Sequence, residues 1–527
     1  MLGALAGLLA AAVALGVGEL VAGVLGPSSS PVVAVGNAVI SLTPEPVKRA
    51  AISAFGQHDK LALISGTLVL VAVFACLVGL VGLRNRRRGV LAFALFGVVG
   101  AVAALTRPAA GPFDALPSLA AAAAGAAALL ALLTPLNQAE AVDGSGRMTG
   151  GSPVDRLREA LGSTDRAGTA MDRRGFFVAG GVAVGAAVLT GGGGRLLQRR
   201  FVVTAERAHL VLPRPASPAA ALPAGADLAA KVDGVTPLFT ANRDFYRIDT
   251  ALTVPQIRPG EYRLTLAGMF DSPRHYTLAQ LYGRDDLVER DITITCVSNE
   301  VGGTLAGSAR WLGVPLGTFL RENGVRPESS QLVCRSVDGM TIGAPTRSAL
   351  DVGDAMLAIG MNGDPLPVEH GFPVRMIIPG LYGYVSACKW LTSIEATTYD
   401  AVDAYWVRRG WASQGPIRIA SRIDTPAPQR AYPAGPRAVA GVAWAQTRGI
   451  SRVEVRVDDG PWTDAELAPG ADTDLWRQWV LRHDFAAGRH TVTVRATSAD
   501  GEVQPEARSD PFPSGATGWH TVEVVVR

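Results

Sequence analysis

Hydrophobic residues are spread unevenly along the chain, and long apolar runs are confined to its first third. Four runs extend over Leu2 to Leu25, Leu61 to Leu83, Val90 to Leu105 and Leu116 to Leu133, and a fifth follows "MDRRGFF", from Phe176 to Thr190. Each approaches the ~20 residues that a membrane-spanning helix needs, and charges are nearly absent from all of them. The pattern therefore predicts about five transmembrane helices in residues 1–190, rather than buried helices of a soluble protein. The first run is not expected to be a cleaved signal peptide, because no Lys or Arg precedes it.

Positive charge predicts the orientation of these helices. "RNRRR", Arg84 to Arg88, joins the second and third runs, and further arginines lie between the fourth and fifth. Loops rich in Lys and Arg stay in the cytoplasm, so everything after about Gly191 should lie outside. "DRRGFF", with Arg173 and Arg174, also resembles a twin-arginine export signal, a motif of low specificity by itself. We expect a multi-pass protein of the cell membrane whose later domains are extracytoplasmic.

Two observations concern chemistry inside the membrane. Glu19 lies within the first run, toward its outer end. An ionisable residue there is either a functional group or a carboxylate that is hydrogen-bonded or reaches the interface. No histidine occurs in any of the five runs, so a membrane-embedded b-type haem with two histidine ligands is not expected.

The pattern changes twice after the apolar runs. Residues 191–235 are rich in Gly and then in Ala and Pro, which is typical of a linker. Residues 236–425 mix strand-like and helix-like segments, such as "YRLTLAGMF" and "VPLGTFLRENG", and indicate an α+β domain. Residues 426–527 alternate apolar and polar positions between turn signals, as in "HTVTVRATSADG", and favour a β-sandwich.

Composition narrows the functional classes. The chain has 527 residues, enough for two to four domains, and its formal net charge of +3 gives no footprint for nucleic acid. The cysteines are Cys76, Cys296, Cys334 and Cys388, and no Cys-x-x-Cys motif occurs. Zinc ribbons and c-type haem are therefore unsupported. Three of these cysteines belong to the outer part, so at least one of them is unpaired there.

One cysteine stands at the end of a predicted strand. In "DITITCVSNEVGG", Asp291 to Gly303, the Ile/Thr pattern runs directly into Cys296. Asn299 and the pair Gly302 and Gly303 then suit a turn with close backbone approach. On residue type alone Cys296 would be a small buried hydrophobe, but a strand end that faces a turn is where functional sites are built.

A second stretch carries cations in apolar surroundings. "EHGFPVRMIIPGLYGYVSACKW" contains His370, Arg375 and Lys389 among Gly, Pro and apolar residues. A buried cation needs an anionic partner, and a fixed phosphate would serve, although surface charge is the alternative. A third stretch, "TPLFTANRDFYRIDTAL", offers amide and aromatic contacts from Asn242, Phe245 and Tyr246.

Together these stretches resemble the sulfite oxidase family of molybdenum enzymes. The matching pieces, in the family's order, are "TANRDFYRIDT", "ITCVSNE" with "GSARWLGVPL", "RSVDG", "HGFPVRMIIPGLYG" with "CKW", and the terminal region from "GVAWAQTRGISRVEV" to "DGEVQ". The resemblance covers about Thr236 to Arg527 and gives no account of residues 1–190. It implies a molybdenum–pyranopterin (molybdopterin) cofactor whose metal takes its protein thiolate, a soft donor, from Cys296, with Asn299 in the same catalytic turn.

The resemblance also implies contacts to the pterin. His370, Arg375 and Lys389 would hold its phosphate. The further contacts that it implies are Asn242, Phe245, Tyr246, Ser336 in "CRSVDG", Ala387 and Cys388.

The expected protein has several domains. Residues 1–190 form an N-terminal α-helical transmembrane bundle and 191–235 a linker. Residues 236–425 form an α+β molybdopterin-binding catalytic domain of sulfite oxidase type, and 426–527 an immunoglobulin-like β-sandwich, which the resemblance makes a dimerisation domain for a homodimer. We expect a membrane-anchored oxidoreductase for two-electron oxygen-atom transfer. No haem, flavin or iron–sulfur motif is visible in this chain, so electrons should pass through a separate carrier, a cytochrome or a quinone-linked protein.

One departure from the family pattern concerns the substrate. Glu300 and Val301 follow Asn299, where sulfite oxidases commonly have arginines that bind the anionic substrate. We therefore expect a small neutral oxygen-atom donor or acceptor, such as a sulfoxide, with a sulfite dehydrogenase of the same family as the alternative. Two other classes stay open: a hydrolase with Cys296 as nucleophile and His370 as base, and a non-enzymatic surface protein that binds a partner through the β-sandwich.

Overall fold

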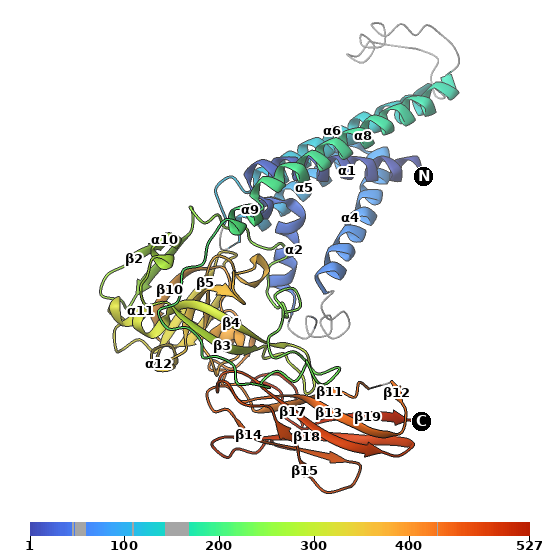
Figure 1. Cartoon of the computed structure of the whole chain (residues 1–527). Helices are drawn as coiled ribbons and strands as arrows, with labels where there is room; N and C mark the ends of the chain where they lie inside the picture. The colour runs from blue at the N-terminus through green and yellow to red at the C-terminus, as the bar shows by residue number, and fades with distance from the viewer. Residues whose placement is uncertain (45–46, 48–58, 108–109, 143–167, 429) are drawn as a thin grey trace. The chain divides into compact units, whose positions relative to one another are not determined.

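The computed structural model describes residues 1–44, 47, 59–107, 110–142, 168–428 and 430–527. The chain divides into two compact units (Figure 1). One comprises Met1–Val202 with Thr250–Thr253, and the other Val203–Asp249 with Val254–Arg527. Within the described residues, the first unit is helical and the second contains all of the strands.

The first unit contains five helices that are long and apolar enough to cross a membrane. They are α1 (Leu2–Leu25), α4 (Asp59–Arg84), α5 (Arg86–Leu105), α6 (Leu116–Val142) and α8 (Gly168–Gln198). Each contains one of the apolar runs, so the prediction of about five candidate spans is confirmed, while their sidedness stays a prediction. A shorter helix, α2 (Pro31–Leu42), begins with Pro31, whose fixed φ suits the first turn of a helix.

Glycine allows close approach between helices of this unit. A Cβ on Gly7 of α1 would lie 1.9 Å from the carbonyl oxygen of Ala75 in α4, and one on Gly194 of α8 would lie 2.5 Å from the backbone of Glu19. The backbones can meet at these crossings only because no Cβ intervenes, a packing typical of membrane helices.

Glu19 is bound by its neighbours. It accepts a hydrogen bond from Nε2 of Gln198 in α8 at 2.9 Å and another from Oγ of Ser30. The carboxylate thus ties α1 to α8 and to the residue that precedes α2, as the hydrogen-bonded interpretation of Glu19 expects. The twin-arginine prediction rests on Arg173 and Arg174, whose side chains lie outside the described residues.

The catalytic region is built on two β-sheets. One is mixed, with strand order β2-β1-β10-β5-β6, and the other is antiparallel, with order β3-β4-β7-β8 and β9 paired to β7. Its strands are β1 (Arg263–Gly268), β2 (Arg274–Thr277), β3 (Val288–Thr295), β4 (Ala306–Pro315), β5 (Gln331–Ser336), β6 (Thr341–Pro345), β7 (Met356–Met361), β8 (Asp364–Pro365), β9 (Arg375–Ile377) and β10 (Leu391–Thr397). Its short helices are α10 (Leu278–Tyr282), α11 (Leu316–Glu322), α12 (Thr346–Asp351) and α13 (Gly383–Ser386). The α+β prediction is confirmed.

The segment predicted as a linker has two different parts. Gly191–Gln198 continues helix α8, which is followed by the short helix α9 (Thr204–Ala208). Further on, Leu210 and Leu212 pack on the core of the catalytic region, and Val235 is buried. These apolar side chains explain why the Ala- and Pro-rich segment lies on a folded surface. The free energy gained by burying them outweighs the conformational entropy that an open linker would keep.

The C-terminal region is rich in β-structure, as predicted. Two sheets, ordered β11-β13-β17-β16 and β12-β19-β18-β14-β15, share one hydrophobic core that contains Val439, Val453, Trp479, Val494 and Val524. Its strands are β11 (Ala420–Thr425), β12 (Ala431–Tyr432), β13 (Gly435–Trp444), β14 (Ile450–Val457), β15 (Thr463–Asp464), β16 (Glu466–Leu467), β17 (Arg477–Phe485), β18 (Gly488–Ser498) and β19 (His520–Val526). Strand β11 already pairs with β13, although it precedes the expected boundary at residue 426. The immunoglobulin-like type and the homodimer stay predictions.

Candidate active site

Cys296 directly follows strand β3 and begins a tight turn. Its N–H donates to the carbonyl of Leu305 at 2.9 Å, and its own carbonyl accepts from the N–H of Asn299 at 3.0 Å. The Asn299 side chain closes the turn, because its Oδ1 accepts from the N–H of Leu305 at 2.8 Å. The strand end and turn predicted at Cys296 are thus observed, and we name residues 296–305 the Cys296 turn.

The thiol of Cys296 is buried, with an exposed fraction of 9%. Burial raises its pKa, while the N–H of Ser298, 3.4 Å from the sulfur, and the charge of Lys389 act in the opposite direction. A buried thiol of this kind becomes a thiolate most readily when a metal cation binds it.

Arg375, in β9, is a buried cation without an anion. Its exposed fraction is 4%, its Nη1 donates to the carbonyl of His370 at 3.1 Å, and its guanidinium lies 5.2 Å from the ring centre of Trp311. Among the described residues its Nε has no hydrogen-bond partner and no carboxylate pairs with it. Burial is the main reason that its pKa falls to about 10. This is the buried cation in need of an anion that the sequence predicted.

Lys389 lies near Arg375 and is paired. Its Nζ is 2.6 Å from Oδ2 of Asp249, which also accepts from Nε of Arg247 at 2.8 Å. Burial lowers the pKa of Lys389 to about 8, although the negative charge of Asp249 acts to raise it. Gly371 permits this arrangement, because a Cβ there would lie 3.1 Å from both Cβ of Arg375 and Cα of Lys389.

Sequence reasoning missed the two charged residues that accompany Lys389. Arg247 and Asp249 lie in "YRIDT", inside a stretch quoted for its amide and aromatic groups. Their spacing of two residues was the available signal, because it lets neighbouring side chains of opposite charge meet on one side of an extended segment.

The stretch "TPLFTANRDFYRIDTAL", predicted to offer amide and aromatic contacts, lies at the same site. The carbonyl of Asn242 accepts a hydrogen bond from Nε2 of His370 at 2.9 Å, and the ring of Phe245 packs edge-on against His370 and stacks on Tyr246. Burial, followed by the charge of Arg375, lowers the pKa of His370 to about 4, so the ring is neutral near neutral pH. Burial and the nearby Cys296 raise the pKa of Tyr246, which therefore keeps its proton.

Ser336 ends strand β5 and is buried, and its Oγ has no hydrogen-bond partner among the described residues. The next residue, Val337, donates to the carbonyl of Trp390, so Ser336 lies beside the segment of Lys389. Ala387 and Cys388 are buried in that segment too. Burial raises the pKa of Cys388, which is thus a neutral thiol.

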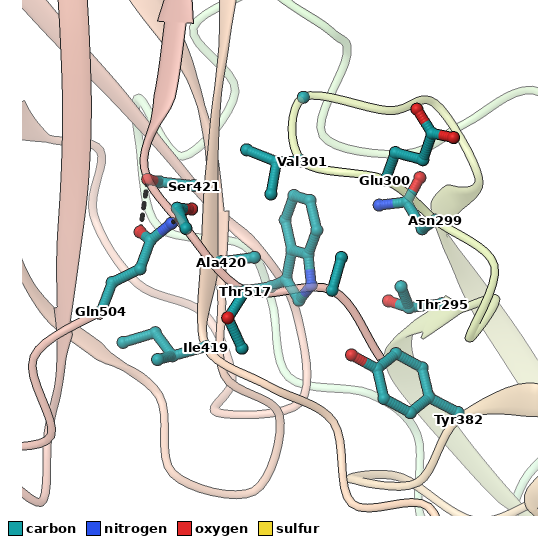
Figure 2. A pocket seen from close by; sticks show the side chains of 14 residues that line it. Thr295, Asn299, Glu300, Val301, Tyr382, Ile419, Ala420, Ser421, Gln504 and Thr517 are labelled. Carbon is teal, nitrogen blue, oxygen red and sulfur yellow. Dashed lines mark hydrogen bonds between the residues drawn. The ribbon is translucent and has the colours of Figure 1, made fainter. Parts of the chain in front are cut away.

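Figure 2 shows the cavity beside the Cys296 turn. Thr295, Asn299, Glu300 and Tyr382 line it from the catalytic region, and Ser421, Gln504 and Thr517 from the C-terminal region. None of the described residues that line it is Lys, Arg or His. The side chain of Glu300 is exposed, and its carboxylate points away from Tyr382.

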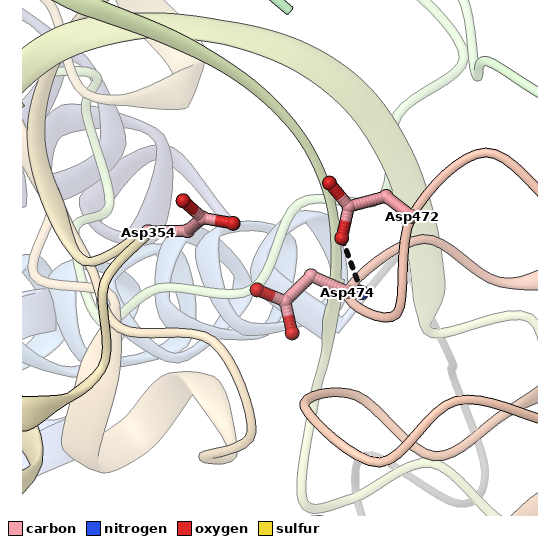
Figure 3. Close-up of side chains that lie close together, drawn as sticks. All are labelled: Asp354, Asp472 and Asp474. Atoms are coloured by element: carbon pink, nitrogen blue, oxygen red, sulfur yellow. Dashed lines mark hydrogen bonds between the residues drawn. The ribbon is translucent and has the colours of Figure 1, made fainter. Parts of the chain in front are cut away.

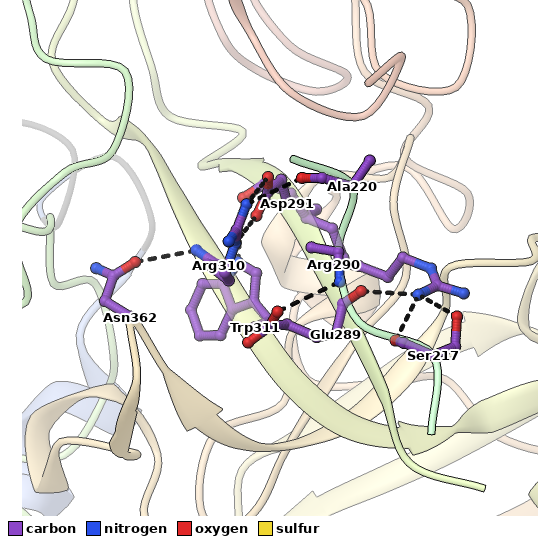
Figure 4. A network of polar contacts seen from close by, with 10 residues as sticks. Ser217, Ala220, Glu289, Arg290, Asp291, Arg310, Trp311 and Asn362 are labelled. Atoms are coloured by element: carbon purple, nitrogen blue, oxygen red, sulfur yellow. Dashed lines mark hydrogen bonds and ion pairs between the residues drawn. The ribbon is translucent and has the colours of Figure 1, made fainter. Parts of the chain in front are cut away.

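Arg310 pairs with Asp291 and not with Glu300. Both ends of its guanidinium bind Asp291, with Nε 2.7 Å from Oδ1 and Nη2 2.8 Å from Oδ2 (Figure 4). Arg290 similarly binds Asp354 and Ser217. This network joins β3 and β4 to the segment before the catalytic region, through Ser217 and Ala220.

A cluster of three carboxylates lies elsewhere in the second unit. Oxygens of Asp354, Asp472 and Asp474 lie within 4.8 Å of one another (Figure 3). Burial raises the pKa of Asp474 to about 7, although the N–H of Thr447 donates to it at 2.7 Å. Sequence reasoning did not single out these residues, because Asp354 lies more than 100 residues before Asp472 and Asp474 in the chain.

Comparison with known proteins identifies the catalytic region. Residues 251–406 match the family model "Oxidoreductase molybdopterin binding domain". Mitochondrial sulfite oxidase of Drosophila melanogaster is 30% identical over 322 residues, which are 51% of this chain and 55% of that protein. Sulfite oxidase of Gallus gallus is 28% identical over 306 residues, 49% of this chain and 66% of that protein.

The chain thus carries the molybdopterin-binding domain of the sulfite oxidase family of molybdopterin-dependent oxidoreductases. It spans between 55% and 66% of the length of these two relatives. Among solved structures, the sulfane dehydrogenase SoxCD from Paracoccus pantotrophus matches at 23% identity and a TM-score of 0.49, over 56% of this chain and 82% of that one.

Membership of the sulfite oxidase family implies a molybdenum cofactor, and the side chains of this site fit it. A phosphate needs cations, and Arg375 is buried with no carboxylate from the described part of the chain, while Lys389 lies beside it. A pterin needs hydrogen-bond partners, and Oγ of Ser336 is buried without one among the described residues. A soft metal needs a thiolate, which Cys296 can supply.

Proposed function

We propose that this chain is a membrane-anchored molybdenum oxidoreductase that transfers an oxygen atom to or from a small neutral compound, such as a sulfoxide, in a two-electron reaction. The observation that carries the proposal is the buried Arg375, which pairs with no carboxylate of the described residues and lies beside Lys389. The same domain carries Cys296, directly after the end of strand β3. A hydrolase that used Cys296 and His370 would have no need of this anion site.

When bound, the molybdenum–pyranopterin group supplies a metal that exchanges an oxygen atom and two electrons. The residues of this chain would bind and orient it. Cys296 would give its thiolate to the metal, and Arg375 and Lys389 would hold the phosphate. The other contacts would come from Asn242, Phe245, Tyr246, Ser336, His370, Ala387 and Cys388.

Two further residues would serve the reaction itself. Asn299 would hold the Cys296 turn closed through its bond to Leu305. Tyr382 lies beside this turn, and burial raises the pKa of its hydroxyl to about 12, so the hydroxyl would stay protonated near neutral pH.

The composition of the Cys296 turn supports a neutral substrate. Its residues 296–305 include no Lys, Arg or His, and their one charged side chain, Glu300, is an acid. Sulfite is the alternative substrate, because the relatives named above are sulfite oxidases. A sulfite site, however, would have to collect an anion beside the metal without a basic side chain from the Cys296 turn itself.

The helical unit would anchor the enzyme in the cell membrane as a multi-pass protein, with the catalytic domain on the extracytoplasmic side. Its five candidate spans and the arginine-rich loop at Arg84 to Arg88 support this orientation. Electrons would reach or leave the metal through a separate carrier, a cytochrome or a quinone-linked protein. The C-terminal β-domain, of immunoglobulin-like type, would form a homodimer.

The test combines metal analysis with a substrate screen. The purified full-length chain should contain molybdenum in about equimolar amount, and it should act on sulfoxides or N-oxides faster than on sulfite. Cys296→Ser should abolish turnover while the fold survives, because a hydroxyl is a poor donor to a soft metal. Cys334→Ser is the matched control, since Cys334 is a buried thiol that contacts Met376 instead of the site. A well-folded Cys296→Ser protein with full activity would refute the assignment.

A further inference from the structure

The Cys296 turn contacts the C-terminal β-domain as well as its own. The carbonyl of Gly303 accepts a hydrogen bond at 3.0 Å from Nη1 of Arg422, which belongs to strand β11. The adjacent Gly302 lies against His520, the first residue of strand β19. Two neighbouring residues of the turn are therefore held by two strands from a different part of the chain.

Arg422 is fixed in three directions. Besides Gly303, its Nε binds Asp424 at 2.6 Å and its Nη2 donates to Oγ1 of Thr236 at 2.8 Å. The side chains of Arg422 and Asp424 each have an exposed fraction of 7%. A buried guanidinium with this many partners cannot swing away, so it sets the position of the carbonyl that it binds.

His520 fills the space beside Gly302. Its Nδ1 accepts from the N–H of Ile423 at 2.9 Å, so the proton of the neutral ring lies on Nε2. A Cβ on Gly302 would lie 2.3 Å from both Nε2 and Cδ2 of His520. Gly302 has φ of +79°, which already favours glycine. The ring edge and the turn are therefore in direct contact.

The strand before Cys296 is held from the same side. Nε2 of Gln446 donates to the carbonyl of Thr293 at 3.0 Å, and the N–H of Trp476 donates to Oγ1 of Thr293 at 2.7 Å. Both partners belong to the C-terminal β-domain. Cys296 is thus flanked on either side in sequence by segments bound to that domain.

We propose that Arg422 and His520 are positioning residues that hold the Cys296 turn, so that the C-terminal β-domain completes the active site. They are not among the residues assigned to the cofactor, and they act through Gly303 and Gly302. The consequence for catalysis rests on the proposed function of Cys296, whereas the contacts that hold the turn are made by protein groups alone.

The test measures how readily iodoacetamide alkylates Cys296, followed by peptide mass mapping, in full-length protein produced without molybdate. The buried thiol reacts only when the turn opens, so the rate reports the open population. Arg422→Gln should raise the rate about tenfold or more, because it removes a charge-assisted hydrogen bond to the turn. Arg495→Gln is the matched control: Arg495 binds Glu454 within the same β-domain, and its loss should leave the rate unchanged.

A second variant decides the matter if Arg422→Gln does not fold. His520→Asn keeps an acceptor for the N–H of Ile423 but deletes the ring edge that touches Gly302, and it should also speed alkylation of Cys296. A rate within about twofold of wild type, in whichever of the two variants folds, would overturn the proposal. A molybdenum-free but well-folded wild-type protein would instead refute the proposed function and leave this measurement valid.

Discussion

Nζ of Lys389 lies 2.6 Å from Oδ2 of Asp249, and the two side chains have exposed fractions of only 10% and 4%. One buried carboxylate therefore faces Lys389 and Arg247 together. The pair lies beside Arg375, which has no carboxylate of its own among the described residues. The site thus holds more positive than negative charge, as a site for an anion should.

Asp249→Asn should destabilise the cofactor-free protein by about 3 kcal/mol, because it leaves a buried lysine without its partner. Asp351→Asn breaks the exposed pair with Arg347 and should cost less than about 0.5 kcal/mol. Urea unfolding followed by tryptophan fluorescence measures both. In the loaded enzyme the loss at Asp249 should shrink, since a bound phosphate would then neutralise Lys389. Equal losses at the two positions would contradict this account of the pair.

Acid should weaken the contact at His520. Burial, followed by the charge of Arg422, lowers the pKa of His520 from 6.5 to about 4 in the folded protein, so the unfolded chain takes up a proton first. The neutral ring therefore contributes fully to the free energy of unfolding above pH 6.5, and this contribution is lost as the pH falls toward 4. Unfolding midpoints measured across this range should fall more steeply for the wild type than for His520→Asn. Parallel profiles would show that His520 does not titrate in this way.

Glu300→Arg should improve turnover of sulfite. At an effective dielectric near 20, two charges ~6 Å apart interact by roughly 3 kcal/mol. Because Glu300 is exposed, water screens its charge and the interaction energy is smaller. We therefore expect about a tenfold gain in kcat/KM. Glu300→Gln should give a smaller gain in the same direction. A wild-type kcat/KM for sulfite of ~10⁶ M⁻¹s⁻¹ or above would mean that basic residues outside this turn build the pocket.

Arg173→Lys combined with Arg174→Lys should leave the catalytic domain inside the cell. The double variant keeps the charge that sets helix orientation but removes the twin-arginine pair, which would export a domain already folded around its cofactor. Protease accessibility of the second unit in intact spheroplasts reports the outcome. Normal exposure of that unit would show that the two arginines act only as topological charges.

The sequence predicted those features that depend on local pattern. Apolar runs located the candidate spans, and the Ile/Thr strand that ends at Cys296 located the turn. Cations in an apolar stretch predicted that Arg375 would be buried. Such features follow from the order of residue types, which local structure obeys.

The pairings between distant segments could not be predicted in this way. Asp249 meets Lys389 across 140 residues, and Arg422 meets Gly303 across 119. A single sequence gives no distance between such segments. The pattern around Arg422 predicts a strand of a β-domain, but it does not indicate that this strand contacts the Cys296 turn. The short helix α2 and the packing of residues 210–235 were missed for a related reason, because tertiary burial decides them and local composition does not.

The buried guanidinium of Arg375 should also make the stability of the folded chain depend on a bound anion. Without an anion beside it, the folded chain keeps a desolvated charge in its interior, and a ligand that binds only the native state stabilises that state. An empty chain should therefore open more often and be cut sooner by proteases than a loaded one. Quality control of this enzyme could then depend on its intrinsic stability alone, with no receptor needed to inspect the cofactor.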